Sequence, residues 1–471
     1  MDKSKELLKN TLIIAVGKIC TQFISFFLLP VYTSLLTTEE YGLVDLLSTL
    51  VSFLIPLVAI QIEQASFRYL IEARENEEQK SRIISSGIMF LISTITIYTF
   101  IFLIVSGFIH NEYKYFLLFN VIICIFSNFL LETARGLGKN QHYALAGMIS
   151  AVSTLVLNIL FVVVLRLGAY GILTANFIGN LFCAIFLLFA LRLYKYLKLN
   201  KADTKVVKSL LGYSLPLVPN SLSWWIINNS DRTIITIFLG VALNGIYSAA
   251  NKFSTVYISI YNIFNITWTE SVSVHINDKE GEIFFIRILD KSIRIFTSIS
   301  LGIISIMPFA FHFLIDEKFK LAFYQIPLLM IASFLNALIG LISTLYIAKK
   351  MTVEVAKTSA MAAVINIVLN LLFIRSLGLY AASISTILAY GSMLIYRLIS
   401  IDRLFQIRLD GKLMTAIFIM YGITLGAYYS AQPLLQILNL ILIVIFCIFI
   451  NRRLIGSIIT ILKYRKYIHE W

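Results

Sequence analysis

Charged residues and the motifs of common soluble enzymes are scarce in this sequence. Only 14% of its 471 residues are charged, whereas 59% are hydrophobic, which excludes an ordinary soluble domain. There is no Walker A motif and no glycine pattern typical of dinucleotide binding, so direct ATP hydrolysis is not expected. None of the five histidines stands at a metal-ligand or catalytic-triad spacing. We therefore predict that the chain is not an enzyme.

Cysteines are also few, and their positions carry no pattern. Cys20, Cys124, Cys183 and Cys447 each stand alone in an apolar stretch, without a CxxC motif or a Cys/His spacing. Isolated cysteines in such stretches are typical of small core residues or of residues that face lipid. No disulfide, metal site or cofactor is expected.

Long apolar runs, by contrast, fill most of the chain. About 20 apolar residues suffice to span the hydrocarbon core of a bilayer, and runs of that length predict helices because the backbone must pair internally in lipid. The predicted fold class is all-α, a polytopic membrane protein with about 14 transmembrane helices. The expected spans are residues 9–36, 41–70, 83–108, 114–134, 141–166, 169–192, 210–239, 242–273, 284–314, 321–348, 354–375, 378–401, 413–430 and 433–450.

Lys and Arg are distributed unevenly around these runs, which predicts the orientation. Of the 39, 30 lie in the gaps or in the adjoining ends of spans on the N-terminal side of the series, five lie on the opposite side and four lie further inside runs. Short cytoplasmic loops accumulate Lys and Arg, so both termini are predicted to be cytoplasmic. This asymmetry also accounts for the net charge of +14, and no nucleic-acid partner is expected. The first run lacks an A-x-A-like site and is predicted to be an uncleaved helix.

The two halves of the chain are similar in sequence. A shift of about 206 residues places YGLVDLLST (41–49) on YSAANKFST (247–255), and a shift of 212 places LNILF (157–161) on LNLLF (369–373). Chance matching between apolar segments is the alternative. A parallel repeat predicts an N-terminal six-helix lobe, a cytoplasmic linker, a C-terminal six-helix lobe, and two extra helices with a basic tail. Their predicted limits are 1–193, 194–209, 210–401 and 402–471.

Most polar residues of the predicted spans lie in the first two spans of each half. The four cations within spans are Lys18, Arg68, Arg232 and Lys252. A charge inside a transmembrane helix is costly, so each cation is a functional-site hypothesis. Cations at two depths are what a translocated anion requires, and the tryptophans are candidates for stacking on a sugar. The further substrate-binding candidates are Gln22, Asn228, Trp224 and Trp268.

Carboxylates within the spans are candidates for ion coupling. Helix rise places Lys18 and Glu63 at similar depth in the cytoplasmic half, and it places Asp231, Arg232, Asn251 and Lys252 at similar depth in the outer half, near Asp45. A carboxylate that alternates between a cation and a proton or Na⁺ would provide a way to release a bound anion. The candidates are Asp45, Glu63, Asp231 and Glu270. The alternatives are static ion pairs, a snorkelling Arg68 and tryptophans that only pack or anchor.

Four segments resemble those of one transporter family. They are LPVYTSLLTTEEYGLVDLLSTL (29–50), SFRYLIEARENEE (66–78), ARGLGKNQHYA (134–144) and DRTIITIFLGVALNGIYSAANKFS (231–254). Across the first twelve spans, the chain resembles the polysaccharide exporter (oligosaccharide flippase) branch of the superfamily that also contains multidrug and toxic compound extruders and the lipid II flippase. The last segment is the most specific, because Asp-Arg, FLG and GIY-Ser-Ala-x-x-Lys together are characteristic of sugar-lipid flippases.

The resemblance implies a V-shaped pair of six-helix lobes that works by alternating access. The implied substrate is an undecaprenyl-diphosphate-linked oligosaccharide, of the O-antigen type, moved from the cytoplasmic to the outer leaflet of the bacterial inner membrane. The cationic cavity of such families would correspond here to Lys18, Arg68, Arg232 and Lys252. A proton or Na⁺, a polysaccharide polymerase and a chain-length regulator are implied partners. The last two helices are expected to form a groove for the lipid tail, as in lipid II flippases.

Two other functions stay open on the sequence. A cation-coupled multidrug extruder of the same superfamily would favour acidic and aromatic cavity residues, and four intramembrane cations argue against it. A membrane enzyme of glycan assembly, such as a polymerase or ligase, typically carries a large outer loop with catalytic residues. Every outer loop predicted here is short.

Overall fold

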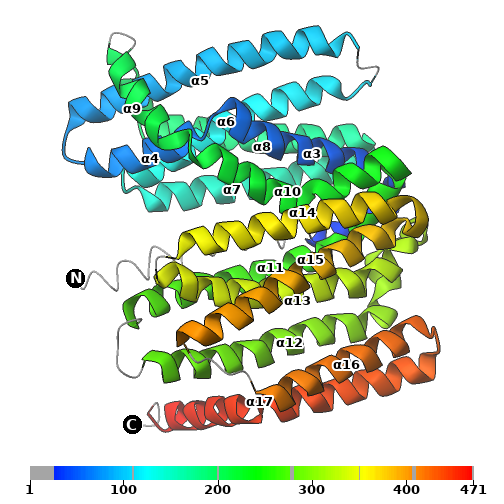
Figure 1. Cartoon of the computed structure of the whole chain (residues 1–471). Coiled ribbons are helices and arrows are strands. Elements are labelled where there is room, and N and C mark those ends of the chain that lie inside the picture. The colour runs from blue at the N-terminus through cyan, green and yellow to red at the C-terminus, as the bar shows by residue number, and fades with distance from the viewer. Residues whose placement is uncertain are drawn as a thin grey trace. The chain divides into compact units, whose positions relative to one another are not determined.

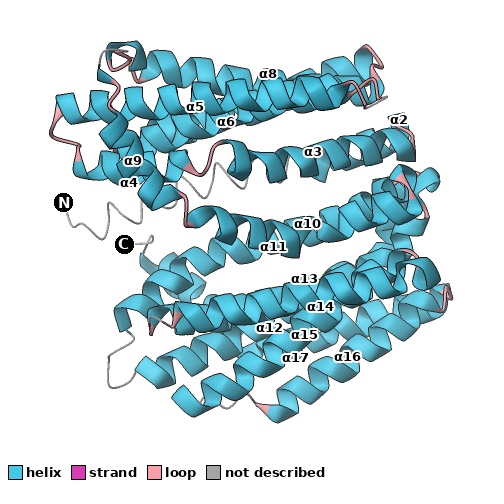
Figure 2. Cartoon of the chain, turned by 45° about the horizontal axis from the view of Figure 1, so that its top comes forward, coloured by secondary structure: helices cyan, strands magenta, loops and turns pink. Residues whose placement is uncertain are grey.

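The fold is helical throughout the part of the chain that the structure describes. This computed structural model describes residues 26–108, 111–198, 201–275, 281–349, 351–405 and 410–468, and every regular element in them is a helix (Figures 1 and 2). The chain divides into two compact units, Met1–Ser248 (unit 1) and Ala249–Trp471 (unit 2). Each unit is described by itself below.

Unit 1 consists of a series of mostly long helices joined by short loops. Helix α3 begins with a capping box, in which the Thr37 side chain accepts from the Glu40 backbone N–H and the Glu40 carboxylate accepts from the Thr37 N–H. The elements are α2 (Leu29–Leu35), α3 (Thr38–Val58), α4 (Ile62–Glu72), α5 (Glu77–Ser106), α6 (Lys114–Gly136), α7 (Asn140–Asn158), the π-helix η1 (Ile159–Val164), α8 (Gly168–Ala190), the 3₁₀ turn η2 (Leu193–Lys195), α9 (Thr204–Ser214), α10 (Leu217–Leu239) and the start of α11 (Val241–His275).

Unit 2 continues α11 and is built around one central helix. The membrane-spanning stretch of α13 is 67% buried, whereas that of α17 is 17% buried, so α13 is central and α17 is peripheral. The elements after α11 are α12 (Gly281–Leu314), the 3₁₀ turn η4 (Glu317–Phe319), α13 (Leu321–Ala348), α14 (Thr352–Leu377), α15 (Leu379–Phe405), α16 (Gly411–Tyr429) and α17 (Pro433–Ile468).

Eleven helices among the described residues are long and apolar enough to cross a membrane. Each of them overlaps one of the predicted spans, which confirms a polytopic all-α membrane fold. Helices α10 and α11 do not reach the same apolarity, because α10 carries Asn228, Asp231 and Arg232 and α11 carries Asn251 and Lys252. Most of the first predicted span, 9–36, lies outside the described residues.

Two predicted spans are not continuous helices. The span 41–70 is two helices, α3 and α4, separated where Ile60 and Gln61 adopt left-handed φ values of 51° and 55°. Pro56 lacks the N–H that would bond within the helix, and α3 ends two residues later. The span 210–239 is likewise divided into α9 and α10, where Pro216 caps the second helix.

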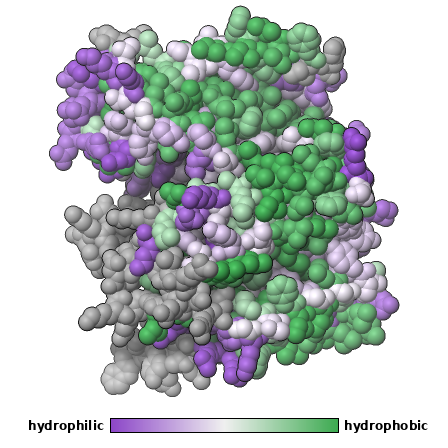
Figure 3. Space-filling view, in the orientation of Figure 1, coloured by the Kyte–Doolittle hydropathy of each residue, from purple (hydrophilic) through white to green (hydrophobic). Residues whose placement is uncertain are grey.

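The apolar surface follows from the membrane setting. In unit 1 the core lies between α4, α5, α6 and α8, where Ile62, Leu91 and Phe129 have no solvent exposure. Outward side chains of α5, such as Phe100 and Ile104, are exposed and apolar, as expected for residues that contact lipid. Figure 3 shows hydrophobic residues over the middle stretches of the helices and hydrophilic residues near their ends.

Candidate functional site

Three helices of unit 1 meet at a close backbone crossing. Gly240, with a φ of 96°, ends α10 and lets the chain turn directly into α11. The start of α11 then crosses α3 through Gly42 and Gly245. A Cβ on Gly42 would overlap the Val241 carbonyl oxygen, and a Cβ on Gly245 would overlap that of Thr38. Only glycine fits at these two positions without moving the helices apart.

A buried polar cluster lies one turn beyond this crossing. Arg232 Nη1 on α10 donates to Asp45 Oδ1 on α3 at 2.8 Å. Ser248 Oγ donates to the same oxygen at 2.7 Å, and Asn244 Nδ2 donates to Asp45 Oδ2 at 3.3 Å. Asn244 Nδ2 also donates to the Gly42 carbonyl at 3.1 Å, so the cluster is tied to the crossing. We call Asp45, Arg232, Asn244 and Ser248 the Asp45 cluster.

The charges and the burial of the Asp45 cluster would allow Arg232 to exchange Asp45 for another anion. The side chains of Arg232 and Asp45 are 19% and 10% exposed, so their attraction is only weakly screened by water. The carboxylate is held by two neutral donors besides the guanidinium. Arg232 Nε is buried and has no hydrogen-bond partner within the described ranges, so one donor of the guanidinium is unsatisfied while Asp45 holds Nη1. The cluster could therefore hold a phosphate beside or in place of Asp45.

Asp231 lies next to the cluster but faces a different neighbour. It is buried, and Tyr247 Oη donates to its carboxylate at a long 3.4 Å. Lys252, its predicted partner, belongs to unit 2. The predicted pairing of Asp231 with Lys252 stays a prediction.

The cytoplasmic candidates are only partly described. Lys18 and Gln22 lie outside the described residues, and the side chain of Glu270 does too. Glu63, on α4, is buried with 6% exposure, as a coupling carboxylate would be. Arg68 pairs with Glu72 at 2.8 Å while both remain exposed, an arrangement that fits the snorkelling alternative.

The aromatic and amide candidates differ in accessibility. Trp224, on α10, is 49% exposed, and its carbonyl accepts from the exposed Asn228 side chain at 2.7 Å. Trp225 donates to the Thr49 carbonyl at 3.1 Å and so anchors α10 on α3. Trp268, in unit 2, is buried and donates to the Leu341 carbonyl at 3.1 Å. Its burial gives no support to the predicted stacking on a sugar.

Arg397 is a buried cation that sequence reasoning missed. It lies on α15 with 1% exposure and bonds to Thr358 at 2.9 and 2.7 Å, to the Val355 carbonyl at 3.1 Å, and to the hydroxyls of Ser359 and Ser343. Arg397 lies four residues before the predicted end of its span at 401, so it was counted with the cations of the loops. The three hydroxyl residues on neighbouring helices were the available signal. Arg397 ties α13, α14 and α15 together.

The sequence matches one protein family over more than half of its length. The family is described as polysaccharide biosynthesis protein, and the match covers residues 7–268. The chain belongs to this family. The matched region of this polysaccharide biosynthesis family member contains the whole Asp45 cluster, and the family confirms the resemblance inferred from the sequence. A comparison with curated proteins finds no match.

Solved transporter structures share the fold of this family member. An inward-facing multidrug resistance MATE family transporter of the MOP superfamily matches with a TM-score of 0.67 and 14% identity, covering 82% of this chain and 96% of the other. Lipid II flippase MurJ, in an inward closed conformation, matches with a TM-score of 0.66 and 15% identity, covering 95% and 100%. At these identities the matches establish the fold. This chain shares that fold with a MATE family transporter and with a lipid II flippase.

Proposed function

We propose that this family member flips a polyprenyl-diphosphate-linked oligosaccharide from the cytoplasmic to the outer leaflet of the bacterial inner membrane by alternating access. The polysaccharide biosynthesis family and the flippase-like fold support this class of substrate. The observation that carries the proposal is the partly buried Arg232, held by Asp45 in a membrane-type helix bundle. A cation at such a position is costly unless it has an anionic partner to bind.

The chemistry of the substrate matches that of the Asp45 cluster. The planar guanidinium group of an arginine can donate two parallel hydrogen bonds to the oxygens of a diphosphate. Asp45 would hold Arg232 when no substrate is bound, and a phosphate would replace the carboxylate during transport. Ser248 and Asn244 would continue to hold Asp45 after that exchange, because their bonds to it do not involve Arg232.

The other predicted residues take supporting roles in this proposal. Lys18, Arg68 and Lys252 would bind phosphate at other stages of transport, and Gln22, Asn228 and Trp224 would contact the glycan. The buried Trp268 would instead hold α11 on α13. Asp45, Glu63, Asp231 and Glu270 would couple transport to a proton or Na⁺. The lobes at 1–193 and 210–401, the cytoplasmic termini and a polymerase or chain-length regulator as partners are part of the same proposal.

Reconstitution of the full chain tests the proposal. Vesicles that contain a labelled polyprenyl-diphosphate oligosaccharide would be scored for the fraction of glycan that a lectin reaches from outside. We expect wild type to move the glycan and Arg232→Ala to fail, while Arg232→Lys retains part of the rate. Arg135→Ala is the matched control, because Arg135 pairs with Glu132 at 2.7 Å elsewhere in unit 1 with similar partial burial. Full activity of Arg232→Ala at normal abundance would refute the proposal.

A multidrug extruder is the second candidate, and the MATE match supports it. An extruder would transport small organic cations in the same vesicles and would not discriminate in favour of a diphosphate. The partly buried Arg232 argues against a site for cations at the Asp45 cluster, because like charges repel. Transport of a cationic dye, without transport of the lipid-linked glycan, would favour the extruder.

A further inference from the structure

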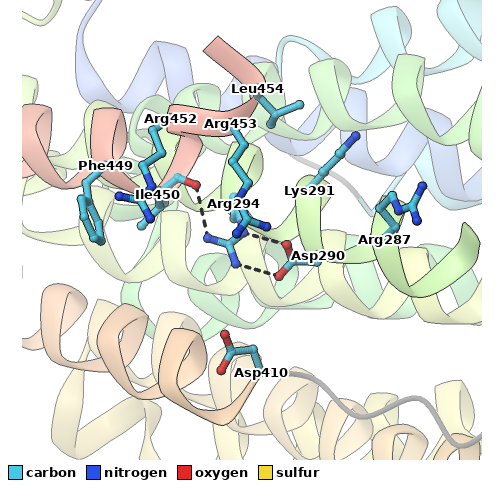
Figure 4. A pocket seen from close by; sticks show the side chains of 10 residues that line it. All are labelled: Arg287, Asp290, Lys291, Arg294, Asp410, Phe449, Ile450, Arg452, Arg453 and Leu454. Carbon is cyan, nitrogen blue, oxygen red and sulfur yellow. Dashed lines mark hydrogen bonds and ion pairs between the residues drawn. The ribbon is translucent and has the colours of Figure 1, made fainter. Parts of the chain in front are cut away.

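A cationic pocket in unit 2 lies apart from the Asp45 cluster. It has a volume of about 540 Å³ and is formed by α12, the start of α16 and α17 (Figure 4). Volumes of roughly 300–1,000 Å³ are typical of sites for small ligands. Its lining residues include five cations and two carboxylates: Arg287, Lys291, Arg294, Arg452 and Arg453, with Asp290 and Asp410.

One ion pair fixes the frame of the pocket. Arg294 binds Asp290 through two bonds of 2.8 and 3.1 Å, and its Nη1 donates to the Ile450 carbonyl at 3.2 Å, which joins α12 to α17. Asp410 caps α16 by accepting from the Lys412 N–H at 3.0 Å. In Figure 4, Arg287 and Lys291 lie on one side of Arg294 and Arg452 on the other.

The pocket therefore carries a surplus of positive charge. The pair of Arg294 and Asp290 is neutral, and among the described lining residues the four other cations, Arg287, Lys291, Arg452 and Arg453, outnumber the other carboxylate, Asp410. Two of the four come from α12 and two from α17, so they converge from two helices. Convergent Lys and Arg side chains with one acid among them are suited to a phosphate.

The position of the pocket on its two helices bears on the kind of phosphate that could bind there. On α12 Arg294 is followed by a run without Asp, Glu, Lys or Arg at 295–311, and on α17 Arg452 follows such a run at 433–451, so the charged residues of the pocket lie where both apolar runs end. The side chains of Ile445, Ile448 and Phe449 are exposed on α17, Phe449 at 61%. They precede Arg452 by seven, four and three residues, which puts all four on one helix face. Arg452 itself lies over the Phe449 ring at 5.0 Å.

We infer that this pocket binds the phosphate headgroup of an anionic phospholipid, with an acyl chain along the exposed apolar face of α17. The headgroup lies among Arg287, Lys291, Arg452 and Arg453, on the side of the membrane that the sequence predicts to be cytoplasmic. Basic pockets between helices on that side are suited to anionic lipid headgroups. The inference is independent of the transported substrate, since it uses no residue of the Asp45 cluster.

Lipid binding to the full chain tests the inference. The purified protein would be titrated with phosphatidylglycerol or phosphatidylcholine in mixed micelles, and one-lipid complexes would be counted by native mass spectrometry. We expect phosphatidylglycerol to bind at least fivefold more tightly than phosphatidylcholine. The double variant Arg287→Gln/Arg452→Gln, which leaves the Arg294 frame intact, is expected to weaken phosphatidylglycerol binding roughly tenfold or more.

A matched variant distinguishes binding at this pocket from a general attraction between the lipid and the positive charge of the protein. Arg82→Gln/Lys357→Gln removes two exposed cations outside the pocket, whose partners are Glu78 and Glu354, and is expected to bind like wild type. Unchanged elution and thermal midpoint would show that each variant is folded. Equal binding of the two lipids, or an equal loss in both double variants, would overturn the inference. Displacement of phosphatidylglycerol by inorganic phosphate at micromolar concentration would also overturn it, because the site would then serve a soluble anion.

Discussion

Substitutions at the pair of Arg232 and Asp45 are predicted to change stability and transport in different ways. Removing one member of a buried ion pair costs about 3–5 kcal/mol, because the other charge is left without its partner. Asp45 would keep the bonds from Ser248 and Asn244, so Arg232→Gln is expected to cost about 3 kcal/mol, at the low end. The double variant Asp45→Asn/Arg232→Gln removes both charges and is expected to cost less than about 1.5 kcal/mol.

The cost of the double variant is therefore expected to be well below the sum of the costs of Asp45→Asn and Arg232→Gln, which is the signature of a favourable coupling. The assay is reversible unfolding in mixed micelles for wild type, both single variants and the double variant. The pair Glu132→Gln/Arg135→Gln gives a parallel cycle at a second ion pair of unit 1. Transport of the lipid-linked glycan is measured on the same four proteins.

The two measurements are expected to disagree for the double variant. Its stability should return close to that of wild type, while its transport should remain absent because no guanidinium is available for phosphate. Additive losses of stability would show that the two residues are not coupled, against the 2.8 Å geometry. Wild-type transport by the double variant would show that Arg232 serves only to hold α10 on α3.

Three further outcomes follow from the fold. Gly42→Val should lower the free energy of unfolding by about 1–3 kcal/mol, because its side chain would overlap the Val241 carbonyl; thermal unfolding would show it, and an unchanged midpoint would contradict the close crossing. Arg397→Met should lower the free energy of unfolding by less than about 1.5 kcal/mol, since the Thr358 and Ser343 hydroxyls also donate to their own helices. Arg397→Glu should lower it by more than about 3 kcal/mol. Equal losses in the same unfolding assay would refute this account. A cysteine at position 201, in a chain with its native cysteines replaced, should resist an impermeant reagent in intact cells, while one at Lys318 should react; the reverse pattern would invert the predicted topology.

The sequence was sufficient for the membrane fold because hydrocarbon thickness sets helix length. The runs near 20 residues therefore predicted helices such as α6 and α8 closely. The break between α3 and α4 was missed because Ile60 and Gln61, which take left-handed φ values, carry no turn signal. Pro56 was the nearer signal, but prolines also occur inside transmembrane helices.

The candidate site was predictable in part. Arg232 and Asp45 stood out as charges in apolar runs, and a similar depth suggested that they were neighbours. Asn244 and Ser248 did not stand out, because single amides and hydroxyls are common in such helices and their partners depend on which faces meet. Arg397 was missed because a cation near a helix end normally reaches water, and only the packing of α13 and α14 around it shows that it does not.

The crossing at Gly42 and Gly245 has a mechanical consequence. Where two helices touch through bare backbone, one can tilt against the other without forcing interlocked side chains past each other. We expect the crossing to act as a pivot about which the rest of α3 can tilt once the bond from Trp225 to the Thr49 carbonyl is released. From Gly42 to Val58 that part of α3 is about 24 Å long at about 1.5 Å per residue, so a tilt of about 10° would displace its far end by about 4 Å. The Asp45 cluster, only three residues from the pivot, would hardly move.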